Sequence, residues 1–323
     1  MKYLVTGSSG FIGFHLCKRL CELGFEVHGV DNHNDYYDVD LKESRESFLS
    51  DFKNFSFFKL DLNDKAKIDS LFKNNCYEKV IHLAAQAGVR YSLTNPLTYG
   101  ESNLSGFLNI LEACRTYCPK NFIFASSSSV YGNTNKFPLN ESDPTDMPAS
   151  LYAATKKSNE LLAYSYSSLY KFPSIGLRFF TVYGPYGRPD MAYYSFTKSI
   201  INNQPIKVFN QGKMYRDFTY IDDIIDGIFS ILDMDIRDSR DNSFFEIYNI
   251  GSGRPINLSD FIEKLEGALG KKANIIFEEM QPGDVFKTYA DTSKLTERTG
   301  FQAKTSFDQG IENFVKWYKE FYS

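Results

Sequence analysis

Short apolar runs alternate with amphipathic segments through the first half of the chain. The apolar runs predict buried strands at residues 2–6, 26–30, 55–60, 79–83, 121–125 and 174–179, and helical periodicity marks residues 11–23, 96–117 and the segment after residue 150. Strands that alternate with helices indicate a parallel sheet with right-handed crossovers and a ligand site at the carboxyl ends of the strands. The pattern therefore predicts an α/β fold built on a doubly wound parallel sheet, the Rossmann arrangement.

After residue 180 the pattern breaks into shorter, mixed pieces. Helices are expected at residues 191–202, 221–232, 258–269 and 307–322, strands at 206–209, 216–220 and 247–250, and a charged surface loop at 235–243. We therefore expect residues 1–180 to form the doubly wound domain, with segments of about 206–250 partly returning to it. Residues 181–323 should form mainly a smaller, mixed α/β substrate-binding region.

Composition narrows the class of protein. The 323 residues are 42% hydrophobic and 24% charged, which is typical of a globular chain of about two domains. The net charge of −4 argues against a nucleic-acid partner, and no apolar run approaches the roughly 18 residues that would span a membrane. With no signal peptide evident, we expect a cytoplasmic protein. Five cysteines and four histidines without metal-site spacing predict reduced thiols and no metal.

A glycine motif follows the first strand. Gly7 would allow a tight turn, Gly10 the approach of a pyrophosphate, and Gly13 close packing of the next helix, whose amino end can bind phosphate. Asp31 ends the second strand, where a carboxylate can bond both ribose hydroxyls and repel a 2′-phosphate. This favours NAD over NADP, with a simple glycine turn and a helix-capping Asp as the alternative.

Three further strand ends carry candidate ligand residues. Asp61 could accept a hydrogen bond from an adenine amino group, although capping the following helix is equally consistent with its position. The small residues Ala84 and Ala85 suit a backbone that passes close to a cofactor. The serines at 126–129 form either a polar loop or a row of hydroxyls that meets a substrate.

Tyr152 and Lys156 lie one helical turn apart near the start of a predicted helix. An ammonium beside a phenol favours the phenolate and lowers the tyrosine pKa, which would give a base near neutral pH. The same spacing also occurs in ordinary surface pairs. The glycine motif upstream supplies the electron acceptor that a catalytic pair needs, and so favours the catalytic interpretation.

Together these motifs resemble the extended short-chain dehydrogenase/reductase family over essentially the whole chain. The resemblance rests on the glycine motif, Asp31, Asp61-Leu62, the run 82–85, the serines before 130–132, Tyr152 with Lys156, and the run 216–218. Within the family, residues 85–92, 150–157 and 178–191 look most like UDP-glucuronate 4-epimerases.

The resemblance implies an NAD-dependent 4-epimerisation of UDP-glucuronate to UDP-galacturonate through a transient 4-keto sugar. Tyr152 would be the base, Lys156 would lower its pKa and bind the nicotinamide ribose, and Ser127 would hydrogen-bond the reacting oxygen. The implied cofactor-binding residues are Gly7, Gly10, Phe11, Ile12, Gly13, Asp31, Asn32, Asp61, Leu62, Leu83, Ala84, Ala85 and Phe179, together with Tyr152 and Lys156.

The implied uronate places a special demand on the pocket. Its 4-keto form is a β-keto acid, which loses CO₂ when the carboxylate electrons overlap with the carbonyl. A pocket for this sugar should therefore anchor the carboxylate where its electrons overlap poorly with the carbonyl. Candidate anchors are the hydroxyls of Ser128, Ser129 and Thr181 and the guanidinium of Arg188, which suits bidentate carboxylate binding. Thr181 replaces the usual Asn of the family, either to make room for the carboxylate or through mere divergence.

The remaining implied contacts concern the nucleotide and a partner subunit. By motif matching, Arg216 would hold the diphosphate and Asp284 the uridine ribose, while Arg90 could contact the sugar, the diphosphate or only solvent. Family resemblance also implies a homodimer that packs the helices near 96–117 and 151–170. Alternative functions are a UDP-glucose or UDP-N-acetylglucosamine 4-epimerase, a UDP-glucuronate decarboxylase, or a non-catalytic NAD-sensing scaffold.

Overall fold

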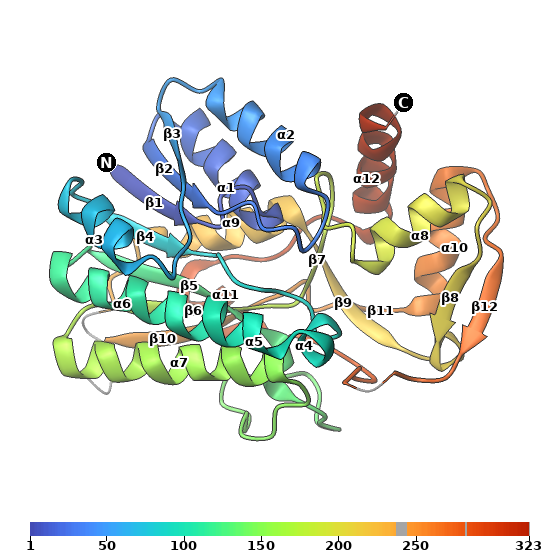
Figure 1. Ribbon diagram of the computed structural model, residues 1–323. Helices are drawn as coiled ribbons and strands as arrows, with labels where there is room; N and C mark the ends of the chain where they lie inside the picture. The colour runs from blue at the N-terminus through green and yellow to red at the C-terminus, as the bar shows by residue number, and fades with distance from the viewer. Residues whose placement is uncertain (237–243, 282, 323) are drawn as a thin grey trace.

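A seven-stranded parallel sheet forms the centre of the computed structural model, which describes residues 1–236, 244–281 and 283–322. Its strand order is β10-β6-β5-β4-β1-β2-β3 (Figure 1). The strands are β1 (Lys2–Thr6), β2 (Glu26–Asp31), β3 (Phe55–Lys59), β4 (Lys79–His82), β5 (Asn121–Ser127), β6 (Ser174–Phe179) and β10 (Phe245–Ile250). The predicted doubly wound α/β fold is confirmed, because each neighbouring pair is parallel and helices separate the strands along the chain.

Helices cover both faces of this sheet (Figure 1). One layer contains α1 (Phe11–Glu22), α2 (Val39–Ser50) and α9 (Ile221–Leu232), and the other contains α3 (Lys65–Lys73), α6 (Gly106–Tyr117) and α7 (Leu151–Tyr170). Successive side chains of a strand point to opposite faces. Accordingly, Tyr3 and Val5 pack with the α1 layer, whereas Leu4 packs with the α3 layer.

The helix expected over residues 96–117 has three parts. It begins with α5 (Pro96–Tyr99), continues through a π-helical turn (Gly100–Ser105) and only then becomes α6. The turn contains the buried Asn103, whose side chain bonds to a neighbouring loop rather than to its own helix. A π-turn inside a helix often marks a functional site.

The second half of the chain adds two small sheets, seen at the right of Figure 1. One has the order β11-β9-β7 and the other pairs β12 with β8. The strands are β7 (Thr181–Tyr183), β8 (Ile206–Phe209), β9 (Tyr215–Tyr220), β11 (Pro255–Asn257) and β12 (Ile275–Glu278), and the helices beside them are α8 (Ala192–Ile201), α10 (Leu258–Leu269) and α12 (Phe307–Phe321). Two shorter helices are α4 (Tyr91–Thr94) and α11 (Ser293–Thr299), and 3-10 turns span Ser128–Tyr131 and Asn210–Gly212.

Several of these pieces were not predicted from the sequence. Strands β7 and β11 have only three residues each, which is too short for an alternating pattern to register, and the four-residue strand β12 was also missed. Helices α3 and α11 were also missed, and both are short. Of the charged loop expected at residues 235–243, the part 237–243 lies outside the described residues.

Candidate active site

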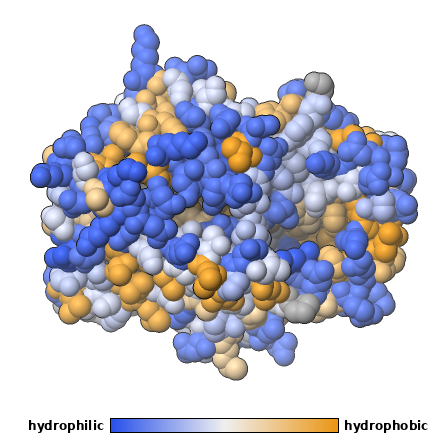
Figure 2. Space-filling view, viewed as in Figure 1, coloured by the Kyte–Doolittle hydropathy of each residue, from blue (hydrophilic) through white to orange (hydrophobic). Residues whose placement is uncertain are grey.

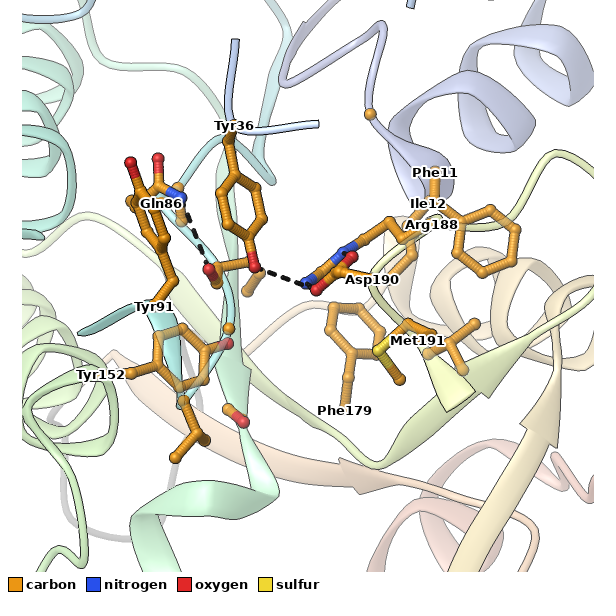
Figure 3. A pocket seen from close by; sticks show the side chains of 18 of the residues that line it. Phe11, Ile12, Tyr36, Gln86, Tyr91, Tyr152, Phe179, Arg188, Asp190 and Met191 are labelled. Carbon is orange, nitrogen blue, oxygen red and sulfur yellow. Dashed lines mark hydrogen bonds and ion pairs between the residues drawn. The ribbon is translucent and has the colours of Figure 1, made fainter. Parts of the chain in front are cut away.

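One cavity of about 910 Å³ lies where the carboxyl ends of the sheet strands meet the second half of the chain. In Figure 2 the centre of the molecule is hollowed between its two parts, and Figure 3 shows the cavity from close by. Every site residue expected from the sequence lines it: Gly7, Gly10, Phe11, Ile12, Gly13, Asp31, Asn32, Asp61, Leu62, Leu83, Ala84, Ala85, Arg90, Ser127, Ser128, Ser129, Tyr152, Lys156, Phe179, Thr181, Arg188, Arg216 and Asp284. Their individual roles stay predictions, but their common location is a finding.

The loop between β1 and α1 requires its glycines. Gly7 has φ +74°, and a Cβ there would lie 2.7 Å from the Ala84 main-chain nitrogen. A Cβ on Gly13 would lie 2.0 Å from the Gly7 oxygen. Because both obstacles are backbone, neither can move aside. Gly10 begins helix α1 without a side-chain cap, so the amino end of the helix can receive an anion.

Asp31 lies at the end of β2 beside this loop. Its two carboxylate oxygens accept hydrogen bonds from the main-chain nitrogens of Ser9 (3.2 Å) and His33 (3.0 Å). A carboxylate has about four acceptor positions, so it can still accept from a diol in the cavity. Asp31 does not cap a helix, because Asp38 caps α2.

Asp61 is likewise not a helix cap. It accepts hydrogen bonds from the Asn32 amide (2.9 Å) and the Asn63 main-chain nitrogen (2.8 Å), while Asp64 caps α3. These bonds lower the pKa of Asp61 even though burial raises it. Of the two positions open to Asp61 from the sequence, the structure therefore excludes the helix cap, and the carboxylate lies in the cavity wall.

The wall after β4 is held by a residue that was not predicted from the sequence. Asn103, in the π-helical turn, accepts from the Gln86 main-chain nitrogen at 2.7 Å and donates to the Gln86 oxygen at 3.0 Å. It also donates to the Thr155 hydroxyl on α7 at 3.0 Å. Asn103 thus joins the loop after β4 to the helix that carries Tyr152.

Tyr152 and Lys156 share the first turns of α7. Ser150 caps this helix by accepting from the Ala153 main-chain nitrogen at 3.1 Å, which fixes where the helix begins. Lys156 is only 3% exposed, and its ammonium donates to the Ala125 main-chain oxygen at 2.8 Å. Burial lowers the pKa of Lys156 to about 8.

The pKa of Tyr152 is raised by burial, and this is partly offset by hydrogen bonding with Ser127 and by the positive charge of Arg188. This differs from the expectation that Lys156 would lower it, because burial dominates and the ammonium is directed to the Ala125 oxygen. In this geometry, Ser127 and Arg188 are the groups that favour the phenolate.

The serine run turns sharply at the end of β5. The Ser127 hydroxyl accepts from the Ser129 main-chain nitrogen at 3.1 Å and lies 3.1 Å from the Ser129 hydroxyl. It thereby caps the 3-10 turn at Ser128–Tyr131. Thr181 begins β7 and lines the same cavity, so hydroxyl groups from two elements face this cavity.

Arg188 already has a carboxylate partner within the chain. Its Nε donates to Asp190 Oδ1 at 3.0 Å and its Nη2 to Asp190 Oδ2 at 2.5 Å (Figure 3). Burial disfavours the charge of Arg188, but the Asp190 carboxylate more than offsets this and raises the arginine pKa. The sequence-based expectation treated Arg188 alone, so Asp190 is an addition to the site.

A second pair lies at another part of the cavity. Arg90 Nη2 donates to Asp284 Oδ2 at 3.0 Å, and the guanidinium lies 4.6 Å from the centre of the Phe209 ring. Arg216 Nη1 donates to the main-chain oxygens of Tyr215 (2.9 Å) and Phe286 (3.3 Å). Two arginines and one carboxylate therefore meet here.

Sequence reasoning missed Tyr36, Gly88 and Asp190 as site residues. Tyr36 lies between β2 and α2, and its hydroxyl donates to Asp190 Oδ2 at 3.0 Å (Figure 3). The only available signal was an aromatic residue in the polar stretch just after a strand end. Asp190 stood two positions from Arg188, but nothing in the sequence indicated that the two pair.

Comparisons with known proteins show the family of this chain. The profile of the GDP-mannose 4,6 dehydratase family matches residues 4–314. The chain is 48% identical to Protein CapI of Staphylococcus aureus, with 100% of this chain and 99% of that protein covered. It is 44% identical to a probable UDP-glucuronate 4-epimerase of Rhizobium meliloti, with 100% and 98% covered.

Among solved structures, a UDP-glucuronic acid 4-epimerase from Bacillus cereus is 34% identical, covers the whole of both chains and has a TM-score of 0.92. That protein was crystallised in complex with UDP-glucuronic acid and NAD. The present chain belongs to the GDP-mannose 4,6 dehydratase family, within the extended short-chain dehydrogenases/reductases. Across the described ranges, no helix is long and apolar enough to cross a membrane.

Proposed function

We propose that the protein is an NAD-dependent UDP-glucuronate 4-epimerase. The observation that carries the proposal is that one cavity contains both the redox group Tyr152, Lys156 and Ser127 and the carboxylate-binding candidates Thr181 and Arg188. A reaction that oxidises C4 of a sugar while holding its C6 carboxylate needs both sets of residues within reach of a single bound sugar ring.

The residues of the glycine loop fit NAD. Side chains at Gly7 and Gly13 would collide with backbone, so this tight loop requires glycine at both positions. The amino end of α1 has no side-chain cap and is therefore open to a pyrophosphate. Asp31 supplies the acceptor for the ribose diol, and the buried Lys156 supplies an ammonium for the other ribose. When bound, NAD would accept the hydride from C4 of the sugar and return it to the opposite face.

Tyr152 moves the proton. As phenolate it takes the proton of the C4 hydroxyl while the hydride leaves, and as phenol it returns that proton when the hydride comes back. Hydrogen bonding with Ser127 and the charge of Arg188 stabilise the phenolate against the effect of burial. The Ser127 hydroxyl also holds the reacting oxygen in place.

Ser128, Ser129, Thr181 and Arg188 hold the sugar carboxylate. The hydroxyls donate to it from the 3-10 turn and the start of β7, and the guanidinium supplies the charge. A carboxylate fixed at several points cannot rotate into overlap with the C4 carbonyl. The pocket therefore suppresses loss of CO₂.

The nucleotide lies beside Arg90, Arg216 and Asp284. Burial lowers the pKa of Arg216, although the guanidinium stays charged, and a diphosphate beside it would raise that pKa again. Asp284 accepts from Arg90 in this structure and would accept from a ribose hydroxyl when the nucleotide is bound. In this arrangement residues 1–180, with strand β10, bind mainly NAD, and residues 181–323 bind mainly the nucleotide sugar.

The protein functions as a cytoplasmic homodimer through α6 and α7. Leucines on the outer side of these helices are exposed, including Leu108, Leu161 and Leu169, and Leu108 and Leu161 line a shallow depression between them. Figure 2 shows hydrophobic side chains gathered over this part of the surface. Packing against the same helices of a second copy would cover them. Light scattering should give a dimer mass, and Leu161→Glu should shift it to a monomer.

A substrate panel followed by NMR tests the proposed activity. We expect UDP-glucuronate to yield UDP-galacturonate, with little turnover of UDP-glucose or UDP-N-acetylglucosamine. A pentose as the main product would instead identify a decarboxylase, and turnover of the neutral sugars alone would identify a hexose epimerase. A protein that binds NAD and converts none of these would be a sensor.

A further inference from the structure

Tyr36 joins two cavity walls that are far apart in the sequence. Its segment follows β2, whereas Asp190, which accepts from the Tyr36 hydroxyl at 3.0 Å, precedes α8 in the second half of the chain. Figure 3 shows the phenol reaching across the cavity wall to this carboxylate. The bond therefore links the NAD-binding part of the chain to the part that carries Arg188.

The position of Tyr36 is constrained on two sides. Gly88 has φ +97°, and a Cβ there would lie 2.3 Å from the Tyr36 hydroxyl oxygen and 3.8 Å from Asp190 Oδ2. The ring of Tyr91 packs against the Tyr36 ring with centroids 4.6 Å apart. Only glycine at position 88 leaves room for the hydroxyl to reach the carboxylate.

Asp190 occupies one edge of the Arg188 guanidinium. The bonds from Nε and Nη2 use two of the five N–H donors of an arginine, which leaves three, including both on Nη1. The edge formed by Nη1 and Nη2 can still bind a second carboxylate in the bidentate manner. The side chains of Arg188 and Asp190 are 22% and 28% exposed, so the pair is only partly shielded from water.

We propose that Tyr36 and Asp190 are positioning residues that fix the plane of the Arg188 guanidinium and so determine specificity for a sugar carboxylate. This inference rests on the proposed epimerase function. Asp190 orients the arginine from one edge, and Tyr36 prevents Asp190 from turning away when a second carboxylate arrives at the other edge. Neither residue needs to touch the substrate for this effect.

The arrangement also explains how one arginine can serve two carboxylates. A guanidinium beside a single carboxylate is nearly neutral as a pair, so a second carboxylate gains little unless the first has another donor. The Tyr36 hydroxyl is that donor, because it hydrogen-bonds Asp190 Oδ2, the same oxygen that Arg188 Nη2 contacts. Hydrogen bonds to a charged group are stronger than neutral ones.

The test compares binding and product formation in the NAD-loaded enzyme and its Tyr36→Phe variant. Losing a hydrogen bond to a charged group corresponds to about a tenfold change, so the dissociation constant for UDP-glucuronate should rise by about that factor. The dissociation constant for UDP-glucose should stay within about twofold, because that sugar has no carboxylate. Asp190→Asn and Gly88→Ala should likewise raise the dissociation constant for UDP-glucuronate relative to that for UDP-glucose.

Product analysis gives a second readout. In a loosened site the C5–C6 bond of the 4-keto sugar breaks, CO₂ leaves, and the electron pair forms the enolate of the C4 carbonyl. C5 then takes a proton, and return of the hydride to C4 gives a UDP-pentose. The pentose fraction should therefore increase in Tyr36→Phe relative to the unmodified enzyme.

Tyr117→Phe is the matched control. The Tyr117 hydroxyl also donates to an aspartate, Asp69, at 3.1 Å, but on the surface and away from the cavity. In this variant, the ratio of the dissociation constants for UDP-glucuronate and UDP-glucose, and the pentose fraction, should equal those of the unmodified enzyme. An equal loss of affinity for both nucleotide sugars in Tyr36→Phe, or no change in either, would overturn the inference. If the unmodified enzyme makes no UDP-galacturonate, the proposed function fails instead.

Discussion

The Lys156 ammonium donates a hydrogen bond of 2.8 Å to the Ala125 main-chain oxygen at the end of β5. This contact ties the helix that carries Tyr152 to the strand that carries the serine run. It also keeps a positive charge in a site that is almost closed to water, since Lys156 is 3% exposed. Holding that charge reduces the stability of the fold in a manner that depends on pH.

The buried ammonium predicts a rise in stability with pH. The pKa of Lys156 is about 8 in the folded protein, against an ordinary value of 10.5. The unfolded chain therefore binds more protons between these values, and the free energy of unfolding should increase by up to about 3 kcal/mol across that interval. Urea unfolding of the protein and of Lys156→Met at pH 7.5 and 10 isolates this contribution. A difference between the two proteins that is independent of pH would contradict it.

Removing the Tyr152 hydroxyl should abolish proton transfer without removing the cofactor. We expect Tyr152→Phe to lower turnover of UDP-glucuronate by about a hundredfold or more, because a positioned acid–base group contributes at least that much. Binding of NAD, measured by calorimetry, should be nearly unchanged since the glycine loop and Asp31 are intact. Activity equal to that of the unmodified protein would rule out the role assigned to Tyr152.

Ser127 should affect the pH at which the enzyme becomes active. Hydrogen bonding with Ser127 lowers the pKa of Tyr152, and burial raises it. Without the hydroxyl, the phenolate forms only at higher pH. The acidic limb of the profile of kcat/KM against pH should therefore move upward in Ser127→Ala. A reduced rate with an unshifted limb would mean that Ser127 contacts the substrate but not the phenol.

An added methyl group should be costly in the glycine loop after β1 and harmless at an open position in helix α10. In Gly13→Ala the new Cβ would lie 2.0 Å from the Gly7 oxygen, so the loop must move. Overpacking of this kind costs about 1–3 kcal/mol, and affinity for NAD should fall with it. Gly267→Ala is the control, because nothing lies within 4 Å of a Cβ there in helix α10. A similar loss of stability in both variants would contradict this account of the loop.

The predictable part of the site is the part encoded locally. The spacing of Gly7, Gly10 and Gly13 and the four-residue step from Tyr152 to Lys156 each follow from the geometry of one turn or one helix. Strand ends such as Asp31 could be placed because parallel strands present their carboxyl ends at a common edge. These features needed no knowledge of distant contacts.

The unpredictable part depends on contacts between distant segments. Tyr36 meets Asp190 across 154 positions, and Arg90 meets Asp284 across 194. Hydrophobic periodicity carries no information about such pairs. The π-helical turn at Asn103 was hidden for a related reason, since a one-residue change in helical register hardly disturbs the apolar pattern of a long helix.

In the proposed reaction, one sugar loses and regains hydrogen at C4 while it keeps its carboxylate. Incubating the enzyme with UDP-glucuronate that carries deuterium at C4, and following the sugar by NMR, tests this directly. We expect UDP-galacturonate that retains deuterium at C4, together with an intact C6 carboxylate. Loss of the label to solvent, a pentose as the main product, or no conversion of UDP-glucuronate would contradict the account.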